Sequence, residues 1–293
     1  MSAINDNRVP LAGIAPSANS DIEIGSGKDR GDENFPVGSW LIRADLRGHV
    51  HAYYSFARNA DDIADHAELT PAAKIDRLDV MEAVLMGARE TGSPSASRLR
   101  ESLRRTGVSA LHAREILIAF RQDATKTRYA NWAELMDYCR YSAAPVGRYV
   151  LDLHDESRNT WPASDALCAS LQVLNHLQDC AADLRDLDRC YVPQDWLALH
   201  GARTDDIARR QTVPALRATF DAMLEKTHEL NRDAALLPGL VKAPRLRVET
   251  ATIVNLARRL TRRLADNDPL FTRVKLKPRD FLAATLRALP SAL

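Results

Sequence analysis

The sequence predicts a single all-α domain with a core large enough to fold on its own. Glycine is scarce, with 12 among 293 residues, which disfavours a turn-rich β fold. Apolar residues recur at helical spacing along most of the chain, without the strict alternation of strands. Connections are short between residues 34 and 290. We therefore expect residues 32–293 to form one domain and residues 1–31 to form a flexible tail.

The helices follow in order from apolar spacing and helix-start signals. The first is predicted over 39–66, with a break near Gly48, because Leu46, Val50 and Tyr53 lie about one turn apart. The second begins at Thr70-Pro71, since proline is favoured in a first turn. Pro145 should kink the helix predicted over 131–154. Further helical patterns cover 94–106, 110–125, 163–186, short pieces within 193–210, then 213–235, 245–266 and a last helix after Pro278.

Composition excludes several classes of protein. Lys+Arg is 40 and Asp+Glu is 39, so the net charge of +1 offers no basic excess for nucleic-acid binding. No run of 18 apolar residues is present, and the N-terminus lacks a basic start followed by an apolar segment. We therefore expect a cytoplasmic protein. The cysteines contain no CxxC pair and are predicted to be incidental thiols: Cys139, Cys168, Cys180 and Cys190.

A first acidic pair, Asp61 and Asp65, lies in the segment FARNADDIAD at 56–65. Residues four apart share a helix face, where two carboxylates repel one another, so helix stability alone does not favour this pair. Arg58 precedes Asp61 by three residues, and Tyr54 precedes Arg58 by four. We predict that these four side chains line one stripe of the helix.

A second acidic pair, Asp179 and Asp183, lies in LQVLNHLQDCAAD at 171–183. Gln172 and Asn175 precede Asp179 by seven and four residues, so they share its helix face. The other residues of this helix are strongly apolar. Because unpaired buried carboxylates are costly, this polar stripe must face water, a cavity or a metal ion.

Two carboxylate stripes on different helices make chemical sense if they face each other across a cavity. They would then share hard divalent cations, and Mg²⁺ typically bridges a few carboxylates to a substrate phosphate. A group of Mg²⁺ ions can hold a diphosphate and help it leave. The alternative is that each pair is a solvated surface pair.

Four motifs of this sequence resemble those of the squalene/phytoene synthase family and follow one another as they do in that family. The resemblance extends from about Asn34 to the end of the chain. The first aspartate-rich motif matches residues 58–65, and the second matches Gln172 through Asp183. Its Arg-x-Tyr tail, followed by proline, matches residues 189–193, and a Tyr-rich segment matches YCRYSAAPVG at 138–147. The resemblance implies an isoprenoid-synthase-type helical bundle around a central cavity. The cavity would be lined by the inward faces of 41–57, 131–154, 163–178 and 213–235.

The resemblance also implies roles at the matched positions. Asp61, Asp65, Asp179 and Asp183 would bind Mg²⁺ with Asn175 as a further oxygen ligand. Arg58 would bind diphosphate, although a plain salt bridge to Asp61 or Asp62 is the alternative. Tyr138 would act in catalysis by steadying a cation through its π face, or would simply fill space. The other implied substrate-binding residues are Asn34, Tyr54, Gln172, Arg189, Tyr191 and Arg273, with Lys275 and Lys277 beside it.

Three features are most similar to the hopanoid-pathway branch of this family: ENFPV at 33–37, Ser-Ala-Ala-Pro at 142–145, and Gln178 where relatives usually have arginine. This similarity implies Mg²⁺-dependent conversion of presqualene diphosphate to hydroxysqualene. The alternatives are a squalene, dehydrosqualene or phytoene synthase, or a non-catalytic assembly factor, which the two complete acidic pairs disfavour. A lipid substrate implies transient contact with the inner membrane surface, and LARRLTRR at 256–263 is one candidate for that contact.

Overall fold

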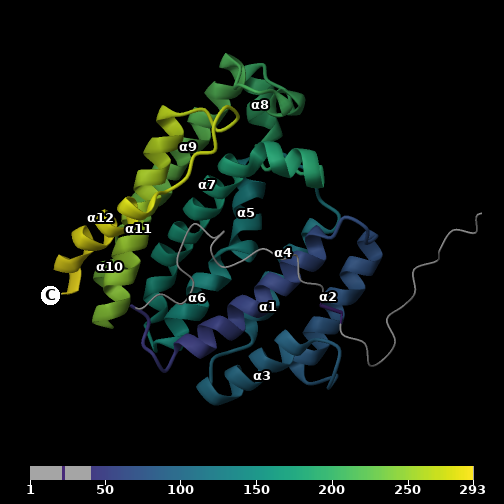
Figure 1. The fold of residues 1–293 in the computed structure, drawn as a ribbon, viewed down its shortest axis with the longest axis vertical. Coiled ribbons are helices and arrows are strands. Elements are labelled where there is room, and N and C mark those ends of the chain that lie inside the picture. The colour runs from purple at the N-terminus through teal and green to yellow at the C-terminus, as the bar shows by residue number, and fades with distance from the viewer. Residues whose placement is uncertain (1–21, 24–40, 293) are drawn as a thin grey trace, which may run out of the picture.

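The computed structural model describes residues 22–23 and 41–292 and confirms the all-α prediction (Figure 1). Within these described residues, the β structure amounts to one isolated bridge between Arg128 and Cys190. The expected tail at 1–31 lies outside the described residues except for 22–23. The α-helices are α1 (Arg47–Asp65), α2 (Pro71–Met86), α3 (Pro94–Thr106), α4 (Leu111–Asp123), α5 (Trp132–Ser142), α6 (Ala144–Leu153), α7 (Trp161–Leu187), α8 (Gln194–His200), α9 (Pro214–Ala234), α10 (Leu237–Leu240), α11 (Pro244–Asp266) and α12 (Pro278–Ala288).

The start of the first helix differs from the prediction. Residues 41–46 form turns, and α1 begins at Arg47, so Gly48 lies in the first helical turn instead of at a break. The Arg47 Nε donates to the carbonyl of Ile42 at 3.0 Å, which folds the entering chain back on the helix start. The second helix begins as predicted, because the Thr70 hydroxyl accepts from the Ala73 N–H and Pro71 occupies the first turn.

The helix predicted over 131–154 is two helices. Ala143 leaves the helical region, with φ −124° and ψ −46°, and separates α5 from α6. Pro145 then lies in the first turn of α6, where its missing N–H is not required. The proline therefore starts a new helix instead of kinking a continuous one.

Two cores support the fold. One lies beneath α1 to α4 and includes Phe56, Leu78 and Leu99. The other surrounds α7, a helix of 27 residues that packs against α5, α6, α9 and α11. The ring of Tyr53 in α1 stacks on that of Tyr149 in α6, with 4.2 Å between ring centroids, and this contact joins the first core to α6. Together, α1, α6, α7 and α11 enclose the space in which the candidate site lies.

Candidate active site

The predicted stripe on α1 lies on a partly exposed face of this helix. Tyr54, Arg58, Asp61 and Asp65 are all partly exposed, whereas the intervening residues of this part of α1 are mostly buried. The Arg58 guanidinium lies 3.1 Å from a carboxylate oxygen of Asp61 and 3.1 Å from one of Asp62. The salt bridge that the sequence left as the alternative role of Arg58 is therefore present, and it reduces the repulsion between the acids of this motif.

The predicted stripe on α7 has the same character. Gln172, Asn175, Asp179 and Asp183 are partly exposed, while residues 173, 174, 176–178 and 180 are buried. The Asp179 side chain is 44% exposed, and Arg273 Nη2 lies 3.9 Å from its carboxylate. The polar stripe thus faces solvent-accessible space along a helix that is otherwise packed into the core, as the sequence predicted.

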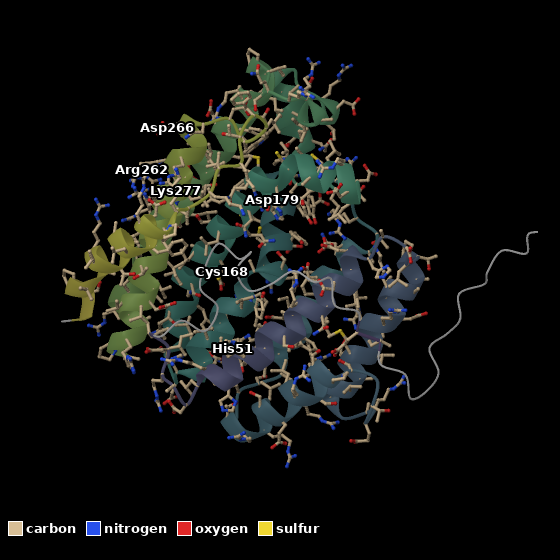
Figure 2. All side chains as sticks on the ribbon, viewed as in Figure 1. His51, Cys168, Asp179, Arg262, Asp266 and Lys277 are labelled. Carbon is tan, nitrogen blue, oxygen red and sulfur yellow. The ribbon has the colours of Figure 1, made fainter. Side chains whose placement is uncertain are left out.

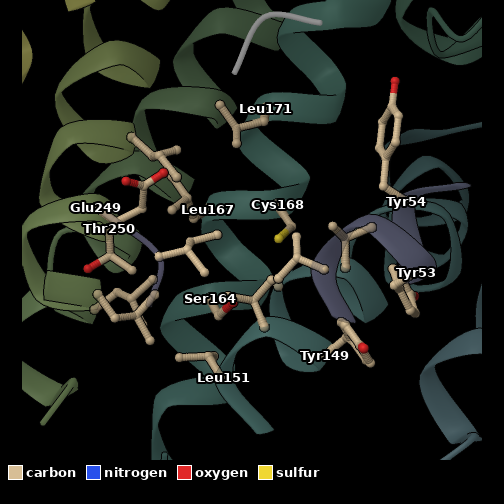
Figure 3. A pocket seen from close by; sticks show the side chains of 18 of the residues that line it. Tyr53, Tyr54, Tyr149, Leu151, Ser164, Leu167, Cys168, Leu171, Glu249 and Thr250 are labelled. Atoms are coloured by element: carbon tan, nitrogen blue, oxygen red, sulfur yellow. The ribbon is translucent and has the colours of Figure 1, made fainter. Parts of the chain in front are cut away.

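A cavity of about 260 Å³ lies between the first halves of the same two helices (Figure 3). Its walls are largely apolar and come from α1, α6, α7, α10 and α11, with Tyr54, Val146, Leu167, Leu171 and Ile253 among the lining residues. Residues 213–235 were expected to form one wall of the cavity, but residues of α11 line it there instead. The volume falls below the roughly 300–1,000 Å³ typical of ligand pockets, so a C30 substrate in this cavity would require its side chains to move apart.

Polar groups are few on the cavity wall, and sequence reasoning missed the strongest of them. Glu249 of α11 is buried, and its carboxyl group lies near Thr250 on the wall opposite Ser164 and Cys168 (Figure 3). The close approach of α6 to α7 depends on Gly147, where a Cβ atom would lie 2.4 Å from the Ser164 hydroxyl oxygen. The signal for Gly147 was its place in the family's Tyr-rich segment.

The cavity and the two stripes are continuous along α1 and α7. Tyr54 lines the cavity and also begins the α1 stripe, while Leu171 lines it and shares a helix face with Asn175 four residues later. At 1.5 Å per residue, Asp61 lies roughly 10 Å along α1 from Tyr54, and Asp179 roughly 12 Å along α7 from Leu171. Figure 2 shows Cys168 and Asp179 at successive levels of α7. Each helix therefore passes from an apolar compartment to an acidic one.

Arg189, just after α7, links the second motif to the first. Its Nη1 donates to the Asp65 carboxylate at 2.6 Å, and its Nη2 donates to the backbone carbonyls of Ala64 at 3.1 Å and Asp123 at 2.9 Å. Burial opposes its charge, but the carboxylates of Asp123 and Asp65 raise the pKa of Arg189 above its usual value. Arg189 is 5% exposed, so it is a buried link between α1, α4 and the end of α7.

Beneath Arg189 lies a buried acid that the sequence analysis did not select. The Tyr138 hydroxyl donates to Asp123 Oδ2 at 2.8 Å. Burial raises the pKa of Asp123 to about 7, against the opposing effects of Arg189 and of the Tyr138 hydroxyl. Asp123 follows Ile116 and Phe120 at helical spacing, on a buried face of α4. That placement of an acid on an apolar face was the signal that could have identified it.

Aromatic rings complete this buried cluster. Tyr191 stacks on His176 with 3.5 Å between ring centroids, and Tyr138 packs against both Tyr129 and Tyr191. Burial, with Arg189 nearby, lowers the pKa of His176 to about 3, so its ring is neutral. Tyr138 and Tyr191 are buried and are not among the residues that line the cavity described above. In this structure they belong to the buried cluster that packs against α7.

A third segment, 271–277, reaches the α7 stripe from the end of the chain. The Gln178 side-chain amide donates to the carbonyl of Val274 at 2.5 Å, next to the contact between Arg273 and Asp179. The Gln178 amide therefore anchors this segment to α7. Asn34 lies outside the described residues.

The donor set fits magnesium. The stripes present carboxylates and the Asn175 amide, which are hard oxygen donors of the kind that Mg²⁺ prefers. Among the residues that the structure describes, no three acidic, histidine or cysteine side chains converge on one point. Such convergence is not required, since Mg²⁺ keeps several waters and is commonly bound by one or two carboxylates together with substrate phosphates.

The fold and this arrangement define a helical protein with an apolar cavity next to two acidic stripes. The family model for squalene/phytoene synthase matches residues 28–280. A hydroxysqualene synthase from Rhodopseudomonas palustris is 46% identical over 271 residues, which cover 92% of each chain. A hydroxysqualene synthase from Sinorhizobium fredii is 46% identical over 251 residues, or 86% of each chain. This chain belongs to the squalene/phytoene synthase family.

The structural comparison agrees. The crystal structure of a squalene synthase from Alicyclobacillus acidocaldarius is similar, with a TM-score of 0.71 and 30% identity. The match covers 81% of this chain and 91% of that one. The predicted isoprenoid-synthase-type fold is therefore confirmed. The family acts on prenyl diphosphates with a divalent metal ion.

Proposed function

We propose that this chain is a Mg²⁺-dependent hydroxysqualene synthase of hopanoid biosynthesis. It converts presqualene diphosphate and water to hydroxysqualene and diphosphate. The observation that carries this proposal is the continuity of an apolar cavity with two acidic stripes along the same two helices. The two hydroxysqualene synthases at 46% identity support the choice of product.

The acidic end of the site binds the head of the substrate. Asp61, Asp65, Asp179 and Asp183, with Asn175, would hold the magnesium ions. Bound Mg²⁺ neutralises the diphosphate and makes it a better leaving group. Arg58 and Arg273 stand beside the two stripes, where each could donate to diphosphate oxygens that the metal leaves open. Lys275 and Lys277 extend this positive charge. Gln172 lies on the same face of α7.

The apolar end binds the hydrocarbon tails and excludes water from the carbocation. Tyr54 lies at the junction, between the cavity and Arg58, so its ring is positioned to stabilise positive charge next to the departing diphosphate. Water then adds to the cation through an oxygen lone pair, and the proton passes to diphosphate. Arg189 holds the acidic end of α1 through Asp65 and also binds the carbonyl of Asp123, while Tyr191 stacks on His176 of α7.

The substrate's chemistry also bears on location. Presqualene diphosphate and hydroxysqualene both carry long hydrocarbon chains that partition into lipid. None of the helices in the described part of the chain is long and apolar enough to cross a bilayer. Transient contact with the inner membrane surface by a cytoplasmic enzyme is therefore part of the proposal.

The test is product analysis with presqualene diphosphate, Mg²⁺, ¹⁸O-labelled water and no NADPH. Hydroxysqualene carrying ¹⁸O is the expected product. A C30 or C40 hydrocarbon formed from farnesyl or geranylgeranyl diphosphate would replace the proposal with a squalene, dehydrosqualene or phytoene synthase. Absence of turnover with every prenyl diphosphate would favour a non-catalytic assembly factor.

A further inference from the structure

Helix α12 exposes an apolar stripe at the surface. Leu282, Leu286 and Leu289 are spaced at four and three residues, so they share one face of α12 and of the turn that follows it. Their exposed fractions are 64%, 58% and 48%. The opposite face, with Ala284 and Ala288, is buried where α12 packs against α11. A stripe of three large exposed side chains is more than the scattered single leucines that a soluble surface normally carries.

The exposed charged side chains along the segment that carries this stripe are basic. Between residues 273 and 291 the exposed charged side chains are all cationic: Arg273, Lys275, Lys277, Arg279 and Arg287. Asp280, the acid in this range, is fully buried, where it pairs with Arg259 at 2.7 Å and with Arg263 at 2.6 Å. A basic rim of this kind along an apolar stripe is complementary to an anionic lipid surface, where leucines enter the acyl region and cations meet headgroups.

The arginine-rich segment 256–263 has another role. Arg259 and Arg263 bind Asp280 and so fix α12 on α11, and Arg263 also donates to the carbonyl of Lys275 at 2.7 Å. Those two arginines of the segment are therefore committed to packing the helices together. They hold the exposed face of α12 in its orientation.

The basic segment also leads to the candidate active site. Arg273 lies 3.9 Å from Asp179, and the carbonyl of the next residue, Val274, accepts from Gln178. Lys277 lies at the other end of this segment, where α12 begins (Figure 2). The short segment 273–277 thus connects the helix that carries the apolar stripe to the acidic end of the candidate site.

We infer that the face formed by Leu282, Leu286 and Leu289 with its basic rim docks on an anionic lipid surface. This inference deepens the proposed function, since it explains how a lipid substrate reaches the site. Its test measures binding alone, so it can fail while the proposed activity stands.

The experiment is co-sedimentation of the full chain with phosphatidylglycerol vesicles and with phosphatidylcholine vesicles. Binding to the anionic vesicles is expected to exceed binding to the neutral ones and to weaken as salt rises. The double variant Leu282→Gln and Leu286→Gln should lower the partition coefficient at least tenfold. Arg279→Glu with Arg287→Glu should abolish the preference for anionic lipid.

The matched control is Leu199→Gln in α8, a leucine that is exposed but lies outside this face. It should bind vesicles as the unmodified chain does. Circular dichroism checks that every variant stays helical. Equal binding by the double variant and the control would overturn the inference. So would a concentration-dependent dimer, seen by analytical ultracentrifugation, that the same leucine changes disrupt, because the face would then bind a second copy of the chain.

Discussion

The acidic stripes of α1 and α7 carry the same chemical groups in different electrostatic settings. On α1, Asp61 pairs with Arg58 and Asp65 pairs with the buried Arg189. On α7, the Asp179 side chain is 44% exposed, and Arg273 approaches it only to 3.9 Å. The α1 carboxylates are therefore held by cations that belong to the fold, whereas Asp179 faces a cation from a surface segment.

This difference indicates a division of labour. An ion pair at 2.6 Å to a buried arginine fixes the position of Asp65 before any metal binds. A hydrated cation can reach an exposed carboxylate without any movement of the fold. Under the proposed function, Asp179 would therefore meet magnesium first, and the α1 stripe would supply a preformed wall.

The largest expected effect comes from removing one acid from either stripe. Asp61→Asn and Asp179→Asn should each lower kcat/KM about 1,000-fold, or about 4 kcal/mol, because each removes a charge that the metal–diphosphate complex requires. Steady-state kinetics measures the loss, and far-UV circular dichroism should remain helical. The control is Asp186→Asn on α7, whose partner is the exposed Arg185. Full activity in both stripe variants would reject the metal-binding role.

The next effect isolates the cation that holds the α1 stripe. Arg189→Met removes the charge that lies between Asp65 and Asp123, and so takes their shared cation from the buried Asp123 and the partly exposed Asp65. The free energy of unfolding should fall by about 3 kcal/mol in urea titration. Arg185→Met, at an exposed pair near the end of α7, should leave it unchanged. Equal stability of the two variants would show that Arg189 is not a structural link.

A smaller effect tests the apolar half of the site. In Gly147→Ala the new methyl group would meet the Ser164 oxygen at 2.4 Å and the Cys168 sulfur at 2.7 Å, so these side chains must change rotamer or α6 and α7 must move apart. Overpacking of this kind costs about 2 kcal/mol. Gly48→Ala in α1, with no atom within 4 Å of its Cβ, should be neutral or stabilising. Thermal unfolding of both variants distinguishes close packing from helix propensity.

The smallest effect concerns pH. The pKa of Asp123 is raised to about 7 in the folded chain, from an ordinary value near 4, so folding favours its protonated form. This contribution to stability is complete at acidic pH and is lost as pH rises through 7, by about 1.4 kcal/mol between pH 6 and 8. In Asp123→Asn that fall should be absent. The measurement is urea unfolding of both proteins across this range; parallel pH profiles would contradict the assignment.

Most helices could be predicted from the sequence, because apolar spacing and capping residues act over a few residues. Residues 94–106 form α3 with the predicted bounds, and Thr70-Pro71 begins α2. The helix was predicted to begin at residue 39, but it begins at Arg47. Apolar residues continue before Arg47, where its side chain binds the Ile42 carbonyl and folds the backbone back. The break at Ala143 follows from Pro145. A kink within one helix was predicted at this proline, but the structure has two separate helices.

The stripes of the site could also be predicted, since each lies on one helix. The contacts between helices could not. Arg189 and Asp65 are 124 residues apart, and no local pattern indicates that they meet. Glu249 lies in a helix whose apolar face was recognised, but which wall of the cavity that helix forms depends on packing over the whole chain.

The most direct test of the central claim, that the two stripes act as one site, is a double-mutant cycle. It measures kcat/KM for Asp61→Asn, Asp179→Asn and the double variant with presqualene diphosphate and Mg²⁺. If both carboxylates serve one metal–diphosphate complex, the double variant should be about as slow as the slower single variant. If the losses multiply to about a million-fold, the two stripes act independently and the shared site is contradicted.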